Sequence, residues 1–358
     1  MDKEQHSSLP GLFGQKHSSR DYTKAEFWGK NQFNSSFPAS LVAYMWARSI
    51  EPVYVCVNAA NKVVHRSISG KDLFGIDPLS DTLYYNFEAN YLPYEKYYVG
   101  KREKIDLVMT DLSTDKAIRG LEIKLTALPD NTTCGKPEDQ FSCEIVVRPA
   151  SICYLACSIC HCYDGSNGRR RLRDLLGQFP NIKHWEDDEQ VVVHLSDMFD
   201  ALDRVARDMY RHQTPLMVQP VWKTNGKKPQ LADNCLDVFV WSNLAVLHMC
   251  RPDKREVRKL SRPHRCLVWI YRMLFEFLTY GQFNYDETIN ELSYTTMNDK
   301  AFSISGTMSY PLLKSPELAC PRIRKDEIKN IILGGGQNLL SPERRFDAII
   351  YNSPDLFA

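Results

Sequence analysis

The sequence lacks any long uninterrupted hydrophobic run. Its most apolar segment, CLVWIYRMLFEFLTYG, is broken by Arg272 and Glu276, so we do not expect it to span a membrane. The first residues, MDKEQHSSLPGLFG, contain no apolar core of the kind that secretory signal peptides carry. With 43% hydrophobic and 25% charged residues and no low-complexity tract, the chain has the composition of a globular protein. We therefore expect a folded cytoplasmic protein.

Several familiar site patterns are also absent. The 11 cysteines follow no disulfide framework, so we expect reduced thiols. Within CYLACSICHC, Cys153, Cys157 and Cys160 recur at the spacing of one helix face, which favours core packing over a metal or iron–sulfur site. The segment ILGGGQNLL lacks the Lys-Ser/Thr of a phosphate-binding loop, and no Ser-His-Asp or Cys-His arrangement is apparent. Nucleotide hydrolysis and covalent nucleophilic catalysis therefore have no support.

The net charge of +1 conceals separate basic clusters. They lie in GRRRLRDLL, in KTNGKK and between Arg251 and Arg272, whereas acidic residues gather elsewhere, as in WEDDEQ. Segregated basic patches on a nearly neutral chain fit a polyanion such as DNA, although solvated helix faces are the alternative interpretation. The candidate DNA-binding residues are Arg169, Arg170, Arg171, Lys223, Asn225, Lys227, Lys228, Arg255 and Arg258.

The hydrophobic patterning predicts an α/β fold. Strands are expected at both ends of PVYVCVNAANKVVHRSIS and in SCEIVVRP, PLMVQPVW and DVFVW. Helices are expected in SDTLYYNFEANYLPYEKYY, PASICYLACSICHC, GRRRLRDLLGQF, SDMFDALDRVARDMYRHQ and RPHRCLVWIYRMLFEFLTY. Strands that first pair antiparallel and then alternate with helices indicate a mixed central sheet flanked by helices.

The clearest predicted element is a β-hairpin made of KIDLVMTD and RGLEIKLTAL. A turn centred near Thr114 places Asp106 opposite Glu122 on the neighbouring strand. Glu122 and Lys124 are two residues apart, so on a strand they share a face. The acid-x-Lys triplet alone is weak, because it occurs about as often as chance predicts and its second copy, at Glu327, lies in an expected exposed helix.

Two carboxylates that face each other repel unless a cation lies between them. Asp106, Glu122 and the backbone carbonyl of Ile123 offer the hard oxygen ligands that Mg²⁺ prefers. Lys124 could orient or deprotonate an attacking water, or stabilise charge on a phosphate. The alternative is an ordinary cross-strand charge cluster on a half-exposed sheet.

The arrangement Asp106…Glu122-Ile123-Lys124 on a hairpin resembles the signature of the PD-(D/E)xK nuclease superfamily, with Lys104-Ile105 in place of the proline before the aspartate. Longer segments are similar to the HindVP/HgiDI-type restriction endonucleases, and they extend over nearly the full chain. These segments are GLFGQKHSSRDY, WGKNQFNSSFPASL, LEIKLTALPDNTT and DVFVWSNLAVL. The resemblance implies the restriction-endonuclease-like core of that superfamily.

The resemblance also implies a function. The chain would be a single domain over residues 1–358, with a nuclease core at roughly 50–225, an N-terminal arm and C-terminal elements for DNA recognition and dimerisation. It would be a homodimer that cuts double-stranded DNA at GRCGYC with Mg²⁺, paired with a cognate DNA methyltransferase. Asp106, Glu122 and Lys124 would be catalytic. Asp106, Glu122 and the Ile123 carbonyl would bind the metal, with Glu88 as a further candidate ligand and Glu95 as its alternative.

Two other functions remain open at this stage. A nuclease of the same fold could act in DNA repair or recombination, where it would prefer structured DNA to a palindrome. A DNA-binding protein without catalytic activity could use the same basic patches. The facing carboxylates argue against pure binding, because they repel a polyanion unless a metal ion lies between them.

Overall fold

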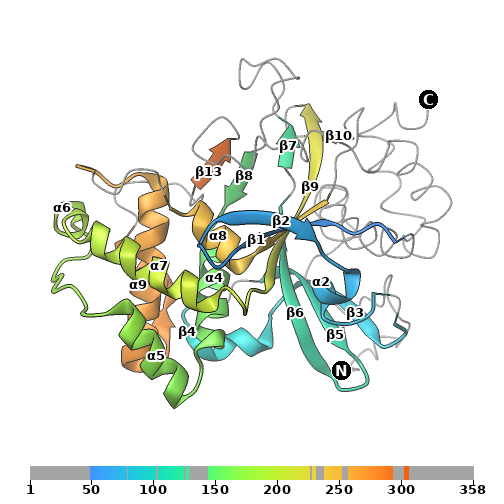
Figure 1. The fold of residues 1–358 in the computed structure, drawn as a ribbon, viewed down its shortest axis with the longest axis horizontal. Helices are drawn as coiled ribbons and strands as arrows, with labels where there is room; N and C mark the ends of the chain where they lie inside the picture. Colours follow the sequence, from blue (N-terminus) through green and yellow to red (C-terminus); the bar gives the residue numbers. More distant parts are fainter. Residues whose placement is uncertain are drawn as a thin grey trace, which may run out of the picture.

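The computed structural model describes residues 49–78, 80–101, 104–124, 126–128, 144–225, 228–230, 238–251, 257–292 and 302–305. Its central sheet (Figure 1) has the strand order β2-β1-β11-β9-β6-β5-β3, and β7 and β10 also pair with β9. These strands are β1 (Val53–Val57), β2 (Val63–Ser67), β3 (Leu83–Ala89), β5 (Ile105–Asp111), β6 (Lys116–Ile123), β7 (Thr126–Leu128), β9 (Pro215–Asn225), β10 (Lys228–Gln230) and β11 (Val238–Ser242).

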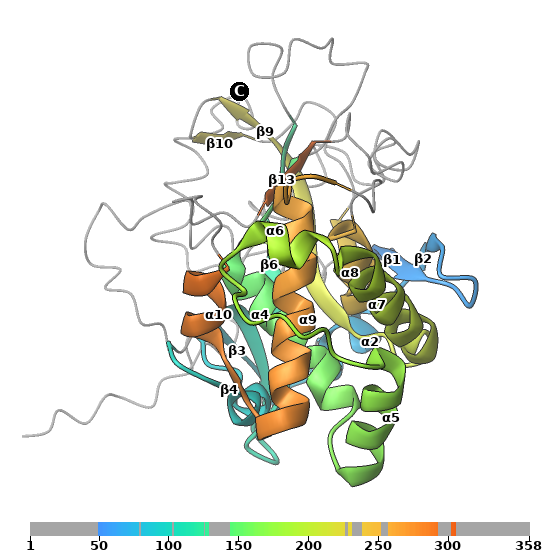
Figure 2. The same ribbon diagram turned by 90° about the vertical axis from the view of Figure 1, so that its left-hand side faces the viewer.

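Two short strand pairs lie outside this sheet, and both join segments that are distant in sequence. β4 (Tyr98–Val99) pairs with β12 (Phe283–Asn284), and β8 (Glu144–Val147) pairs with β13 (Phe302–Ser305). The β8–β13 pair and the β9–β10 hairpin project beyond the helices at the top of both views (Figures 1 and 2).

The longer helices gather on one side of the sheet, at the left of Figure 1 and in front of the strands in Figure 2. The helices are α2 (Gly70–Phe74), α4 (Pro149–Cys162), α5 (Ser166–Leu176), α6 (Asp188–Val192), α7 (Leu195–Met209), α8 (Asn243–Met249), α9 (Arg262–Tyr280), α10 (Tyr285–Glu291) and the 3₁₀-helix η3 (Leu92–Tyr97). α4 packs against α9, α8 and η3, so it lies at the centre of the helical layer.

The sheet is mixed, as the sequence predicts. β5 and β6 form the expected antiparallel hairpin, whereas β9 runs parallel to β6. A parallel pair needs a long crossover connection, and the segment containing α4 to α7 provides it. The chain therefore returns from the helical layer to place β9 directly beside the Glu122 strand.

The prediction of a helix in SDTLYYNFEANYLPYEKYY is wrong. Residues 83–89 form the edge strand β3, and only residues 92–97 are helical, in the 3₁₀-helix η3. Leu83 and Tyr85 are each 5% exposed and occupy alternate positions, which is the periodicity of a half-buried strand. The tyrosine-rich composition of the segment also favours a strand.

The most apolar segment of the chain forms the core helix α9. Ser261 accepts a hydrogen bond from the backbone N–H of His264 at its start, and Gly281 adopts a left-handed conformation with a φ of 82° at its end. Arg272 forms an ion pair with Glu276 one turn further along the helix. No helix in the described segments is long and apolar enough to cross a membrane.

Candidate active site

The hairpin register brings Asp106 and Glu122 to opposing positions, as predicted. Leu107 pairs with Leu121, and the same register continued by one residue sets Asp106 opposite Glu122. The turn between the strands occupies residues 112–115, with Asp115 at a positive φ of 51°. Asp106 is half-buried and Glu122 is only 3% exposed. Two acidic positions therefore adjoin across β5 and β6 in a largely buried setting.

The edge strand β3 adds a third acidic position beside Asp106. Ala89 pairs with Ile105, which sets Glu88 at the register position opposite Asp106. Glu88, Asp106 and Glu122 thus occupy one row across three adjacent strands. The structure describes the backbone of Glu88 but not its side chain, so its role as a metal ligand stays a prediction.

The Glu122 carboxylate is held by two donors. Lys124 Nζ forms an ion pair with Glu122 Oε2, and Ser151 Oγ donates a hydrogen bond to the same oxygen at 3.3 Å. The side chains of Lys124 and Glu122 are 11% and 5% exposed, so the pair is largely removed from water. A buried carboxylate is tolerated when a cation and a hydrogen-bond donor compensate the lost hydration, as they do here.

Asp106 is fixed by the strand that carries the other two residues. Its Oδ2 accepts a hydrogen bond from the backbone N–H of Ile123 at 2.7 Å. The next amide, of Lys124, donates to the carbonyl of Val218 in β9 at 2.8 Å. β6 is therefore tied to β5 on one side and to β9 on the other at the level of the candidate site.

The electrostatics of the site keep Lys124 protonated. Burial alone lowers the pKa of the Lys124 amine, but the negative charges of Glu122 and Asp106 outweigh that effect, so its pKa is raised above the usual value. The positive charge of Arg148 acts in the opposite direction to the two carboxylates. At neutral pH Lys124 is consequently a cation.

Helix α4 contributes residues that the sequence analysis missed. Arg148 is exposed directly before the helix, and Ser151 contacts Glu122. Burial, and next the negative charge of Glu122, raise the pKa of the Tyr154 hydroxyl. No spacing signal could have found them, because Ser151 lies 29 residues beyond Glu122. The sequence predicted the helix but not which of its residues face β6.

The residues at the site suit a hard divalent cation. Asp106 and Glu122 carry carboxylate oxygens, and Ile123, whose N–H donates to Asp106, carries a backbone carbonyl. These are the oxygen ligands that Mg²⁺ prefers. Within the described residues no group of three or more His, Cys, Asp or Glu side chains is positioned to hold a metal. Both described partners of the Glu122 carboxylate contact Oε2, so Oε1 is the oxygen that would be available to a cation. The donor set therefore fits Mg²⁺ with several ligands left to water or substrate.

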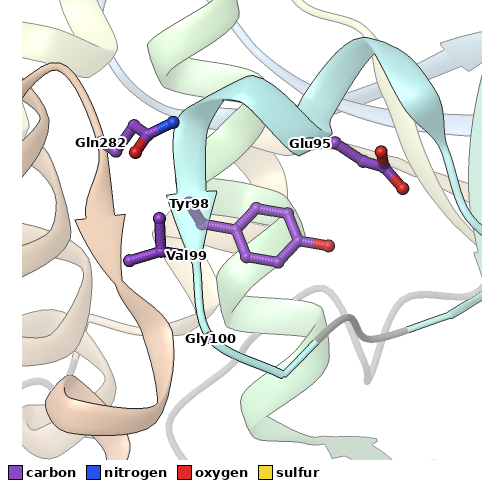
Figure 3. Close-up of a pocket in the computed structure, with 5 residues that line it drawn as sticks. All are labelled: Glu95, Tyr98, Val99, Gly100 and Gln282. Atoms are coloured by element: carbon purple, nitrogen blue, oxygen red, sulfur yellow. The ribbon is translucent and has the colours of Figure 1, made fainter.

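Glu95, the alternative to Glu88, lies in a different place. It lines a pocket of about 310 Å³ together with Tyr98, Val99, Gly100 and Gln282. Figure 3 shows the Glu95 carboxylate and the Tyr98 hydroxyl on the same side of β4, with Gln282 on the other. Neither Asp106 nor Glu122 is among the lining residues, and within the described residues Glu95 forms no metal-holding group with these two carboxylates.

The predicted DNA contacts of α5 are engaged within the protein. Arg169 lies 3.5 Å from Asp164, and Arg171 Nε lies 2.9 Å from both carboxylate oxygens of Asp208. Arg170 donates to the Asn167 side chain at 3.0 Å and is exposed. DNA binding by these three arginines stays a prediction.

The other predicted DNA contacts lie on or beyond β9. Lys223 and Asn225 are in β9 and Lys228 is in β10, where the structure describes the backbone only. Lys227 and Arg255 lie outside the described residues, and Arg258 is exposed before α9. β9 passes the candidate site and continues into the β9–β10 hairpin, so Lys223 and Asn225 lie further along the strand that passes the site and Lys228 lies on the strand paired with it.

The cysteine cluster belongs to the core, as predicted. Cys153, Cys157 and Cys160 lie on α4 and are at most 1% exposed. They are free thiols, and burial raises the pKa of Cys157 and Cys160 well above the usual value. These residues therefore behave as small apolar side chains.

Comparisons with known proteins agree with this arrangement. The model of the HindVP restriction endonuclease family matches residues 28–357. The chain is 40% identical over 351 residues to the type II restriction enzyme HgiDI of Herpetosiphon aurantiacus, covering 97% of each chain. It is 41% identical over 353 residues to the probable type II restriction enzyme HindVP of Haemophilus influenzae, covering 97% of this chain and 95% of that one. No solved structure matches it. The chain therefore belongs to the HindVP restriction endonuclease family and is a restriction enzyme.

Proposed function

We propose that the protein cuts double-stranded DNA at a short palindromic site by Mg²⁺-dependent hydrolysis, with Asp106, Glu122 and Lys124 as the catalytic residues. The observation that supports this most strongly is the convergence of two carboxylates and a lysine at the junction of β5, β6 and β9. Family membership gives the class of reaction, and this junction is where we propose that it takes place.

Each residue has a distinct role in the proposed mechanism. Asp106, Glu122 and the Ile123 carbonyl would hold the metal, which when bound polarises the scissile phosphate and lowers the pKa of a coordinated water. Lys124 is a cation held against Glu122, so it would stabilise negative charge on the phosphate and orient the attacking water. To act as a base it would first have to lose the proton that the two carboxylates favour.

The basic positions on β9 and β10 are proposed to contact the DNA beside the cleavage site. Register places Gln219 beside Lys124, and Lys223 follows four residues later, which is about 13 Å along a strand. Contacts to phosphate outnumber those to bases in such interfaces, so these residues are first of all positioning contacts. They would hold the duplex along β9 with its backbone over the site.

The remaining features follow from family resemblance and symmetry. We propose a single endonuclease domain over the whole chain that acts as a homodimer, since a palindrome is matched by a two-fold symmetric protein. The proposed recognition site is GRCGYC. A DNA methyltransferase of the same specificity would protect the host genome.

The test is cleavage of plasmid DNA with and without Mg²⁺. Wild-type protein is expected to give discrete fragments only with Mg²⁺, and sequencing their ends should show GRCGYC. Lys124→Ala should slow cleavage about 100-fold or more, because it removes the cation beside the reacting phosphate. Lys116→Ala, at the exposed start of the same strand, is the control and should cut normally.

Three outcomes would contradict the proposal. Retarded but intact plasmid would indicate a DNA-binding protein without catalytic activity. Cleavage of structured DNA without a common sequence at the ends would indicate a repair or recombination nuclease. Wild-type rates in Lys124→Ala would remove this lysine from the mechanism.

A further inference from the structure

Ser151 differs from an ordinary buried helical serine. Its Oγ, fully buried, donates to Glu122 Oε2 at 3.3 Å, in a strand 29 residues earlier in the chain. Ser158, two turns further along α4, is 5% exposed and donates instead to the backbone carbonyl of Leu155 at 2.8 Å. Bonding back to the preceding turn is the usual use of a helical serine hydroxyl. The Ser151 hydroxyl is directed away from its helix and toward the candidate site.

The helix that carries Ser151 is packed within the core. The neighbouring Ile152 and Leu155 are completely buried, and α4 packs against α9, α8 and η3. The Ser151 hydroxyl is therefore held in place by the packing of α4 in the core. A fixed donor restricts rotation of the Glu122 carboxyl group about its last bond, which is otherwise a soft torsion.

The other partner of Glu122 is less constrained. Lys124 has a flexible four-carbon stem and a point charge, and in the proposed reaction its amine also serves the phosphate. Whenever Lys124 turns to the substrate, Ser151 is the described donor that still holds Oε2. With Oε2 occupied in this way, Oε1 is the oxygen presented to a cation.

We propose that Ser151 is a positioning residue that orients the Glu122 carboxylate for metal binding. This inference rests on the proposed function, since it assumes that Glu122 is a metal ligand. Residues that hydrogen-bond to a metal ligand and orient it typically contribute about 10- to 100-fold to metal affinity. Ser151 would thus act on the metal through Glu122 without touching the reacting atoms.

The first test measures binding of Mn²⁺ to the full chain from the electron paramagnetic resonance signal of the free ion. Ser151→Ala should raise the Kd for Mn²⁺ about 10- to 100-fold. Ser158→Ala removes another buried hydroxyl from the same helix, one that does not contact Glu122, so its Kd should stay within about twofold of wild type. Glu122→Gln should abolish the same binding event and so assign it to this site.

The second test separates metal binding from catalysis and from folding. In Ser151→Ala, the Mg²⁺ concentration for half-maximal cleavage should rise by the same factor, while the rate at saturating Mg²⁺ recovers to near wild type. Ser151→Cys keeps the side-chain volume with a much weaker donor, and it should show an intermediate shift even if the alanine variant folds poorly.

The outcomes distinguish this inference from the function on which it rests. Equal Mn²⁺ affinities for Ser151→Ala and Ser158→Ala, with Lys124→Ala inactive, would overturn the role of Ser151 and leave the nuclease assignment intact. Wild-type protein that binds no Mn²⁺ at Glu122, or that cuts equally well without Lys124, would overturn both.

Discussion

The ion pair between Glu122 and Lys124 removes two charges from water, which costs free energy unless both partners stay in place. Their side chains are only 5% and 11% exposed. Losing one partner of a buried pair leaves an uncompensated charge and typically costs 3–5 kcal/mol, about as much as losing a large core side chain. The catalytic residues are therefore also expected to be structural residues.

Lys124→Met should lower the free energy of unfolding by about 3 kcal/mol at neutral pH, measured by urea denaturation without metal. The deficit should shrink as the pH falls, because an unpaired buried carboxyl has a raised pKa and is accommodated once protonated. In Glu122→Gln/Lys124→Met no buried charge remains, so the double variant should be more stable than Lys124→Met alone. Equal stabilities would mean that the pair is not coupled.

Residue-scale prediction succeeded where it depended on local geometry. Strand alternation and the position of the turn sufficed to place Glu122 and Lys124 on one face, with Asp106 opposite. The contribution of Ser151 depends instead on how α4 packs onto β6, which is a tertiary contact without a sequence period. Glu95 was suggested by its charge and its order in the chain, and the pocket that it lines includes neither Asp106 nor Glu122.

At the scale of elements, the sequence correctly predicted whether a segment is a helix or a strand where its hydrophobic residues followed one periodicity. The β5–β6 hairpin and helices α4, α5, α7 and α9 all form as expected. The segment around β3 was mistaken for a helix because its aromatic residues fit either period over so short a stretch. Pairing with β5 decides the matter, since that strand needs a partner on its open side.

Two helix ends offer a matched test of element packing. Gly75 ends α2 and Gly281 ends α9, both in the left-handed conformation, with φ of 78° and 82°. A Cβ on Gly75 would lie 2.6 Å from Ile118 Cγ2 in β6, whereas one on Gly281 would meet only the flexible end of Arg169 at 3.4 Å. Alanine at either position thus carries the same backbone cost, but only at Gly75 does its methyl group also clash with a neighbouring residue.

Gly281→Ala should destabilise the protein by about 1 kcal/mol, the usual cost of a left-handed alanine. Gly75→Ala should cost about 1–3 kcal/mol more, because α2 and β6 must separate to admit the methyl group. Thermal unfolding of the two variants side by side measures the difference. Equal melting temperatures would show that α2 does not press on β6.

At the scale of the whole molecule, the mixed α/β class was predictable from the order of strands and helices, but the strand order was not. β1 pairs with β11 and β6 pairs with β9, and each pair joins segments more than 90 residues apart. Such neighbours are chosen by burial of whole layers, which single-segment patterns do not encode. The position of the site at the β6–β9 junction therefore emerges only from the complete sheet.

The proposed dimer makes a prediction about the whole assembly. If each subunit cuts one strand with its own Asp106, Glu122 and Lys124, a dimer of one wild-type and one Lys124→Ala subunit retains one working site. Such mixed dimers, isolated through two different affinity tags after co-expression, should nick a plasmid with one GRCGYC site at about half the wild-type strand-cutting rate. Nicked circles should accumulate, because the second cut needs a fresh encounter. Linear product formed as fast as nicked circles would mean that one site cuts both strands, and it would rule out the two-site dimer.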